Sequence, residues 1–188
     1  IYASLAGSVD YYGLLAAEAL GGGTAPLNAS SDPLAADGVA LEKFGARADV
    51  RRAVKLAKLD LRLESIREWN HALRGLDDDA LLLAAEYARR AGLFDRAINT
   101  AERTTSRHDY ALRYLTPFRT EFASAAQSQG IEEELLYGIA RQESRFVADI
   151  VSSAGAIGLM QIKASTARGI GYAGSSAALY DPETNLAW

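Results

Sequence analysis

The sequence contains no cysteine, so disulfide bonds and thiolate-based catalytic or metal sites are excluded. Its two histidines, His71 and His108, show no partner pattern for a metal site or a catalytic triad. No apolar run approaches the roughly 20 residues that a membrane-spanning helix needs. With a net charge of −4 and a pI near 5.3, the chain also lacks the basic footprint of a nucleic-acid-binding protein. We therefore expect no metal, no cofactor, no transmembrane segment and no nucleic-acid partner.

Apolar residues, by contrast, make up 49% of the 188 residues, which is ample for a hydrophobic core. From Ala48 onward they recur at helical spacing, and very short connections at Gly75 and Gly92 separate the implied helices. Short connections with small alanine contacts are typical of stacked antiparallel helices, as in a helical solenoid. The periodicity breaks over 104–117, which ends in Pro117. We therefore predict a mainly all-α chain with two regions, 1–113 and 114–188.

A helix is predicted at the start of the stretch 131–171. The three consecutive glutamates at 132–134 suit the positive end of the helix dipole, and apolar residues follow at helical spacing up to Ile139. Glu143 lies one turn after Ile139, so we expect it on the inward side of the helix and at the negative end of the dipole. Desolvation and the dipole would then both favour its protonated form, which a general acid requires. Taken alone, Glu143 would be an ordinary solvated residue at a helix end.

A segment rich in glycine and serine follows Glu143. Small residues let backbone approach a ligand closely, and the segment ends at Gln161, whose amide both donates and accepts hydrogen bonds. The order and the spacing resemble the Glu-Ser pair and the Ser-x-x-Gly-x-x-Gly-Leu-Met-Gln string of lytic transglycosylases with a goose-type-lysozyme-like fold. The matching residues are Glu143, Ser144, Ser152, Gly155, Gly158, Leu159, Met160 and Gln161.

Two further segments extend the resemblance. The run 181–186 resembles a third family motif, and 113–119 resembles the junction that precedes the catalytic domain in the soluble, Slt-type members, whose superhelical domain the preceding helices resemble. Lys163 and Ala164 depart from the family's usual Met-Pro, and the chain stops at Trp188, before the tyrosine-bearing motif that closes the family's active site. The resemblance thus implies a helical superhelix over 1–113, followed over 114–188 by a partial lysozyme-like catalytic domain.

The resemblance also implies a reaction with a single catalytic residue. Glu143 would protonate the β-1,4 glycosidic oxygen between N-acetylmuramic acid and N-acetylglucosamine in peptidoglycan, and would then deprotonate the 6-hydroxyl of the muramic acid. The product would carry a 1,6-anhydromuramic acid end. The residues implied to bind the sugar are Ser144, Ser152, Gly158, Met160 and Gln161. Glycan strands are the implied partner and the periplasm the implied compartment, with a role in cell-wall turnover; the sequence identifies no protein partner.

Two alternatives stay open. A lysozyme-like hydrolase would need a second carboxylate to position water. This would be Asp149, the only other one between Glu143 and Gln161, or a carboxylate beyond Trp188. A helical scaffold carrying an inactive remnant of the site is the alternative from a different class, because half a site can bind without turning over. Ordinary structural roles also remain for single residues: Ser144 would satisfy a helix carbonyl, and Leu159 would fill the core.

Overall fold

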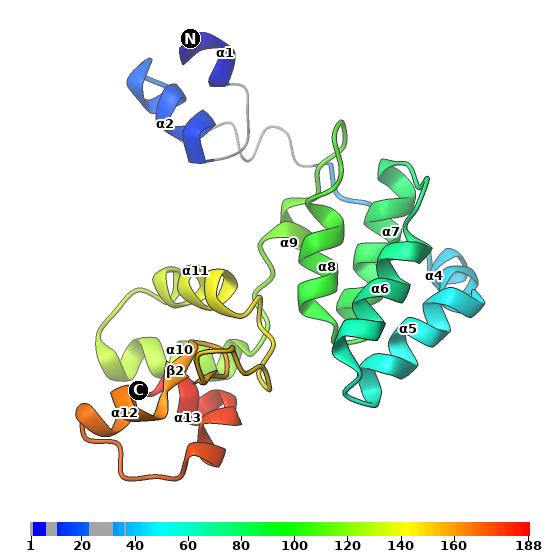
Figure 1. The fold of residues 1–188 in the computed structure, drawn as a ribbon. Coiled ribbons are helices and arrows are strands. Elements are labelled where there is room, and N and C mark those ends of the chain that lie inside the picture. The colour runs from blue at the N-terminus through cyan, green and yellow to red at the C-terminus, as the bar shows by residue number, and fades with distance from the viewer. Residues whose placement is uncertain (1, 7–10, 23–31, 36) are drawn as a thin grey trace. The chain divides into compact units, whose positions relative to one another are not determined.

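The computed structural model describes residues 2–6, 11–22, 32–35 and 37–188, and helices predominate among them (Figure 1). By its internal contacts the chain divides into two compact units, one made of 1–84 and 100–113 and the other of 85–99 and 114–188. The predicted mainly α-helical fold class is confirmed. None of the helices in the described part of the chain combines the length and the apolar character needed to cross a membrane.

The first unit consists of helices joined by short connections. Its helices are α1 (Tyr2–Leu5), α2 (Tyr11–Ala19), α4 (Gly38–Gly45), α5 (Ala48–Lys58), α6 (Arg62–Ala72) and α9 (Tyr110–Arg113), and it shares α7 (Asp78–Arg90) and α8 (Phe94–Ala101) with the second unit.

Trp69 is the central residue of the core of the first unit. Its side chain is 1% exposed, its ring meets that of Phe44 edge to face at 6.1 Å, and its indole N–H donates to Thr100 Oγ1 at 3.0 Å. Ser65, one turn earlier on α6, donates from its hydroxyl to the carbonyl oxygen of Ala53 on α5 at 2.8 Å. Both polar groups are therefore buried with partners, which removes the cost of taking them out of water.

The second unit consists of short helices around a small hairpin. Its elements are α10 (Arg119–Gln129), α11 (Glu133–Glu143), β1 (Ala156–Ile157), β2 (Ile162–Lys163), α12 (Ala164–Gly169), the 3-10 helix η1 (Ser176–Tyr180) and α13 (Pro182–Leu186). Helix α10 contacts both α11 and α13, and α13 contacts η1.

Two clusters form the core of this unit. In one, the rings of Phe122 and Tyr137 stack at 4.0 Å, and Phe146 meets both of them edge to face. Burial raises the pKa of Tyr137 to about 12, so its hydroxyl stays protonated and donates to the carbonyl oxygen of Pro117 at 2.9 Å. The other cluster joins the hairpin to α12 and η1, and its buried members are Ile157, Ala167, Tyr172 and Leu179.

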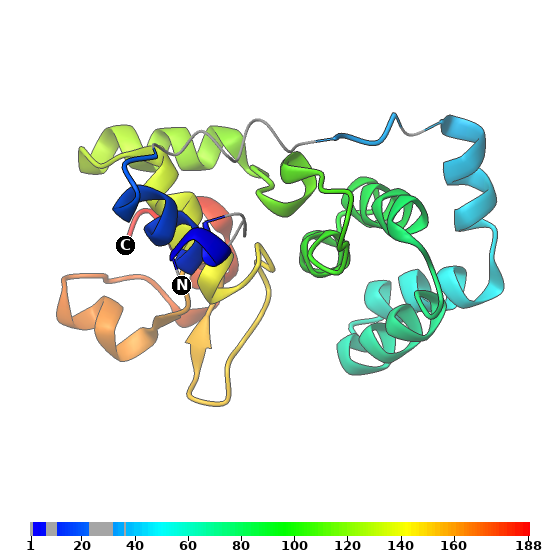
Figure 2. The same cartoon turned by 90° about the horizontal axis from the view of Figure 1, so that it is seen from above.

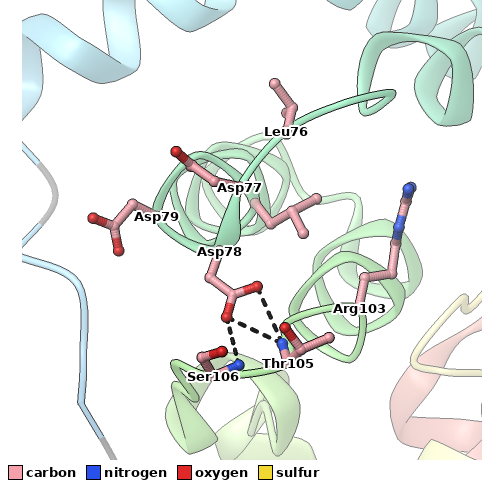
Figure 3. Close-up of a pocket in the computed structure, with 8 residues that line it drawn as sticks. Leu76, Asp77, Asp78, Asp79, Arg103, Thr105 and Ser106 are labelled. Atoms are coloured by element: carbon pink, nitrogen blue, oxygen red, sulfur yellow. Dashed lines mark hydrogen bonds between the residues drawn. The ribbon is translucent and has the colours of Figure 1, made fainter.

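A carboxylate at the start of α7 fastens the loop that follows α8. Asp78 accepts hydrogen bonds from the backbone N–H groups of Thr105 and Ser106 (Figure 3) and from that of Arg107, at distances from 2.6 to 3.1 Å. Arg107 in turn donates to Asp79 at 2.7 Å. The three backbone bonds lower the pKa of Asp78 below its usual value of 3.8, because they stabilise only the charged form.

We predict that this fastening is lost in acid. Since the folded-state pKa of Asp78 is depressed, its stabilisation is present above the unfolded value of 3.8 and is lost as the pH falls through the lower folded-state value. Asp78→Asn should therefore lower the thermal midpoint at pH 7 by a few degrees, and the midpoint should fall less steeply in acid than in the parent.

The matched control is Asp77→Asn, which removes the neighbouring charge. Among the described residues, the Asp77 carboxylate accepts from the N–H of Ala80 alone, at 2.9 Å, in the N-cap manner that asparagine reproduces. This variant should keep the parent's slope of midpoint against pH. Equal slopes for the parent and Asp78→Asn would show that the Asp78 bonds do not matter.

Candidate active site

A pocket of about 620 Å³ lies at the start of α7, in the first unit, lined by residues 76–79, 81, 103, 105 and 106 (Figure 3). Its acidic side chains already have partners in the protein: Asp78 binds backbone N–H groups, and Asp79 accepts from Arg107. None of the predicted site residues lies in it. The candidate site is therefore built from α11 and the segment that follows it.

Glu143 is the last residue of α11, as predicted, but it is not on the inward side. The buried residues of the helix are Leu136 and Ala140, and the buried Ser144 continues the stripe one turn later. The apolar residues on Glu143's own side, Leu135 and Ile139, are 54% and 38% exposed, and Glu143 itself is exposed. The predicted desolvation of Glu143 by the helix face is wrong, because the helix packs on the neighbouring stripe.

The side chain of Glu143 makes no hydrogen bond or ion pair with any described residue. Its backbone position is nonetheless fixed. Ser144, 5% exposed, donates to the carbonyl oxygen of Ala140 at 3.1 Å and accepts from the N–H of Phe146 at 3.1 Å. Arg145 and Phe146 both have left-handed backbone, with φ of 50° and 64°, which is unfavourable for residues with a Cβ. The Ser144 hydroxyl stabilises this sharp turn at the end of the helix. Ser144 thus satisfies a helix carbonyl, which is the structural role considered for it in the sequence.

The chain then forms the hairpin of β1 and β2, drawn in gold in Figure 2, in which Ala156 pairs with Lys163. Ser152 shapes the turn before β1. Its carbonyl oxygen accepts from the N–H of Gly155, and its hydroxyl oxygen accepts from the N–H of Ala156 at 3.0 Å. The hydroxyl of Ser152 donates to no described residue. It can therefore donate to a ligand.

Gly158, Met160 and Gln161 form the turn between the two strands. Gly158 has a φ of 77°, and a Cβ at this position would overlap the side-chain nitrogen of Asn185 and lie 2.6 Å from the carbonyl oxygen of Leu179. Gln161 also has left-handed backbone, with a φ of 50°, and its Nε2 donates to the carbonyl oxygen of Gly158 at 2.9 Å. Four of the predicted site residues are thus brought together by one turn and the bend before it: Ser152, Gly158, Met160 and Gln161.

Asn185 is a residue of this region that sequence reasoning missed. It lies on α13, is fully buried and donates to the carbonyl oxygens of Ile157 and Leu179 at 3.0 and 2.8 Å, while its Oδ1 accepts from the N–H of Met160 at 2.7 Å. Its only signal in the sequence is its place within the run 181–186. An amide side chain directly before the apolar Leu186 in that run could have marked it.

Of the other polar residues weighed in the sequence, His71 and His108 belong to the first unit and Asp149 to the second. Asp149 is exposed and bonds to no described residue. His71 is exposed, whereas burial, and then the charge of Arg113, lower the pKa of His108. The part of the chain that the structure describes contains no group of three His, Asp or Glu side chains placed to hold a metal ion.

Comparison with known proteins agrees with this geometry. Residues 121–188, which include Glu143, the hairpin and Asn185, match the family described as "Transglycosylase SLT domain". Residues 43–109 match the family described as "Soluble lytic murein transglycosylase L domain". Membrane-bound lytic murein transglycosylase C of Haemophilus influenzae is 41% identical over 83 residues, which cover 40% of this chain and 22% of that protein.

Solved structures of the same kind superpose on nearly the whole chain. An inactive glutamate-to-glutamine mutant of lytic transglycosylase Slt from Pseudomonas aeruginosa matches with a TM-score of 0.78 and 30% identity over 99% of this chain. The 70-kDa soluble lytic transglycosylase of Escherichia coli matches with a TM-score of 0.75 at 22% identity, which is a likeness of fold. This chain spans 31% and 30% of the two solved proteins. The resemblance to the soluble, Slt-type lytic transglycosylases that was stated from the sequence is confirmed by the two family matches and by the superposed Pseudomonas aeruginosa structure.

We predict that the turn before Gln161 tolerates no side chain at Gly158. Gly158→Ala must displace the Asn185 amide in addition to adopting a left-handed backbone, so it should lower the free energy of unfolding by about 3 kcal/mol or more. The measurement is urea denaturation followed by circular dichroism.

Gly155→Ala is the matched control. Gly155 has nearly the same φ, 75°, but nothing lies within 4 Å of the place that a Cβ would occupy. The control should lose only the backbone cost, on the order of 1 kcal/mol. Equal losses in the two variants would mean that the contact with Asn185 is unimportant.

Proposed function

We propose that the chain supplies the catalytic glutamate of a lytic transglycosylase that cleaves the β-1,4 bond between N-acetylmuramic acid and N-acetylglucosamine in peptidoglycan and leaves 1,6-anhydromuramic acid ends. In this proposal 1–113 is the helical superhelical region and 114–188 contributes a lysozyme-like catalytic segment. The observation that carries it is Glu143: an exposed carboxylate that bonds to no described residue, on a helix end fixed by Ser144, inside the segment that matches the SLT family.

A relative supports the role of a glutamate. The superposed Pseudomonas aeruginosa protein is described as inactive when a glutamate is replaced by glutamine. That substitution preserves the size of the side chain and removes its ability to give and take a proton. Loss of activity from such a change indicates acid–base chemistry by a carboxyl group, and Glu143 is the residue of this chain that we propose for it.

The proposed reaction needs one carboxyl group. Protonated Glu143 gives its proton to the glycosidic oxygen as the bond from C1 of the muramic acid to that oxygen breaks. The 6-hydroxyl of the same sugar bonds to C1, and the Glu143 carboxylate takes the hydroxyl proton. The enzyme returns to its starting state and no water is consumed. Because the nucleophile is part of the substrate, the entropic cost of bringing it to the reacting carbon is largely avoided.

Because Glu143 is exposed in the free protein, a bound substrate would itself help to convert Glu143 into a general acid. A sugar lying along Leu135, Ile139 and Glu143 would cover side chains that are exposed in the free protein. Removing water from the carboxyl group favours its protonated form, which the first step needs. In this proposal, substrate binding therefore creates the environment that the general acid needs.

The turn and the bend before it would hold the sugar. Ser152 offers a hydroxyl hydrogen, Gln161 offers a side-chain oxygen that accepts from no described residue, and Met160 is half-buried beside them in the chain. Gly158 contributes by allowing the turn, and Ser144 by fixing the end of α11.

We further propose that the protein acts in the periplasm, on glycan strands, in the turnover of the cell wall. Support comes from the two family matches and from the Haemophilus influenzae relative, whose name places it on a membrane and on murein. No cofactor enters the proposed reaction.

The direct test of the assignment is Glu143→Gln in the full-length protein. Because the amide is isosteric and Glu143 is exposed and bonds to no described residue, the thermal midpoint should stay unchanged while kcat falls about 10²–10⁴-fold. Glu134→Gln neutralises an exposed carboxylate at the other end of the same helix and should keep the parent's rate. Turnover of Glu143→Gln within tenfold of the parent would refute the role of Glu143.

A second variant separates the one-carboxylate reaction from hydrolysis. Asp149→Asn should retain activity within about threefold, because the intramolecular reaction needs no second carboxylate to position water. A loss comparable to that of Glu143→Gln, with reducing muramic acid ends among the products, would favour the lysozyme-like hydrolase.

A further inference from the structure

The buried amide of Asn185 joins three segments of the second unit. Its Nδ2 donates to Ile157 at the end of β1 and to Leu179 in η1, and its Oδ1 accepts from Met160 in the turn. The orientation of the amide follows from its partners, since two of them are carbonyl oxygens and the third is an N–H group. Every bond from this side chain ends on backbone, so it fixes the course of the chain.

The position of Asn185 is itself well defined. Helix α13 begins with Asp181 as its N-cap, whose carboxylate accepts from the N–H and the hydroxyl of Thr184, and with Pro182 as its first residue. These bonds lower the pKa of Asp181. Asn185 then lies one turn into a short helix whose start is set by its own sequence.

The two Asn185 bonds to Ile157 and Met160 bracket Gly158. The carbonyl oxygen of Gly158 accepts from the backbone N–H of Gln161 at 3.2 Å and from its Nε2 at 2.9 Å, and Nε2 also reaches the carbonyl oxygen of Ile150 at 3.4 Å. Both donors of the Gln161 side chain thus face the protein, and its Oε1 accepts from no described residue. The turn decides which end of the amide faces outward.

We propose that Asn185 is a positioning residue for glycan binding: it holds the turn so that Gln161 presents its side-chain oxygen, and not its nitrogen, to a hydrogen-bond donor on the sugar. The ligand group would be a hydroxyl or the N–H of an acetamido group. This proposal rests on the proposed function for the identity of the ligand, while the hydrogen-bond arrangement stands without it.

Asparagine fits this position better than the side chains nearest to it in size. Aspartate has the same size but, when ionised, donates nothing, so the carbonyl oxygens of Ile157 and Leu179 would face a negative charge. Leucine fills the space without any bond. A glutamine is longer by one methylene group, and Gly158 leaves no room beside the amide.

The test compares Asn185→Asp with the matched control Leu186→Ala in the full-length protein, with soluble glycan strands as substrate. Leu186 is buried on the same helix but bonds to nothing in the turn. Simple destabilisation reduces the amount of folded enzyme, so Leu186→Ala should lower the apparent kcat and leave KM unchanged. Loss of positioning weakens binding, so Asn185→Asp should raise KM at least tenfold and change kcat less than threefold.

A KM for Asn185→Asp equal to that of the parent would overturn the proposal. If this variant does not fold, side-chain amide hydrogen exchange in the unliganded parent decides instead. The Nε2 protons of Gln161 should exchange at least tenfold more slowly than those of the exposed Gln142, and in step with the N–H of Met160, because all of them open when the Asn185 bonds break. Exchange of Gln161 as fast as Gln142 would overturn the proposal. Failure of the parent to release anhydro products would instead refute the proposed function and leave the exchange result standing.

Discussion

The rotation of α11 about its own axis is the constraint on which the candidate site depends. Leu136, Ala140 and Ser144 follow one another a turn apart and are all buried, so the inward face of the helix is fixed. Glu143 precedes Ser144 by one residue and therefore lies about 100° away around the helix. The carboxyl group is exposed because of this packing, and a rotation that buried it would expose the stripe that holds the helix to the protein.

The sharp turn that follows α11 also fixes the position of the end of the helix. Arg145 and Phe146 each have left-handed backbone, which costs on the order of 1 kcal/mol per residue. The Ser144 hydroxyl bond and the burial of the Phe146 ring against Phe122 and Tyr137 offset that cost. The chain therefore turns away from Glu143 at a fixed point, and the segment that follows is directed into the hairpin. A rigid helix end is what a proton donor needs, because proton transfer depends on distance.

Much of this arrangement could be predicted from the sequence, and the failures have physical causes. The three glutamates at the start of α11 and the apolar spacing after them predicted the helix, and the resemblance carried by the Ser-Gly string named Ser152 and Gln161, which lie in the turn and the bend before it. The phase of the helix could not be predicted, because Leu135 and Ile139 form as good an apolar stripe as Leu136 and Ala140. Which stripe is buried depends on the surface it meets.

The hydrogen-bond partners of Asn185 could not be predicted from the sequence either. Its three partners are backbone groups at 157, 160 and 179, and a sequence does not say which distant carbonyl or N–H group a side chain will meet. The role that we propose for it follows from the turn that it holds next to Gln161. Sequence patterns thus named the candidate residues, and the hydrogen bonds show which backbone segments hold the turn between them.

In the reaction that we propose, the exposed glutamate, the fixed helix end and the oriented amide form a site that the substrate completes, and one carboxyl group both gives and takes a proton. The central claim is that no water enters the products. Digestion of purified peptidoglycan by the full-length protein in heavy-oxygen water, followed by mass spectrometry of the released fragments, tests it most directly. The account predicts anhydromuramic acid ends that contain no heavy oxygen. One heavy oxygen in each newly formed muramic acid end would contradict it.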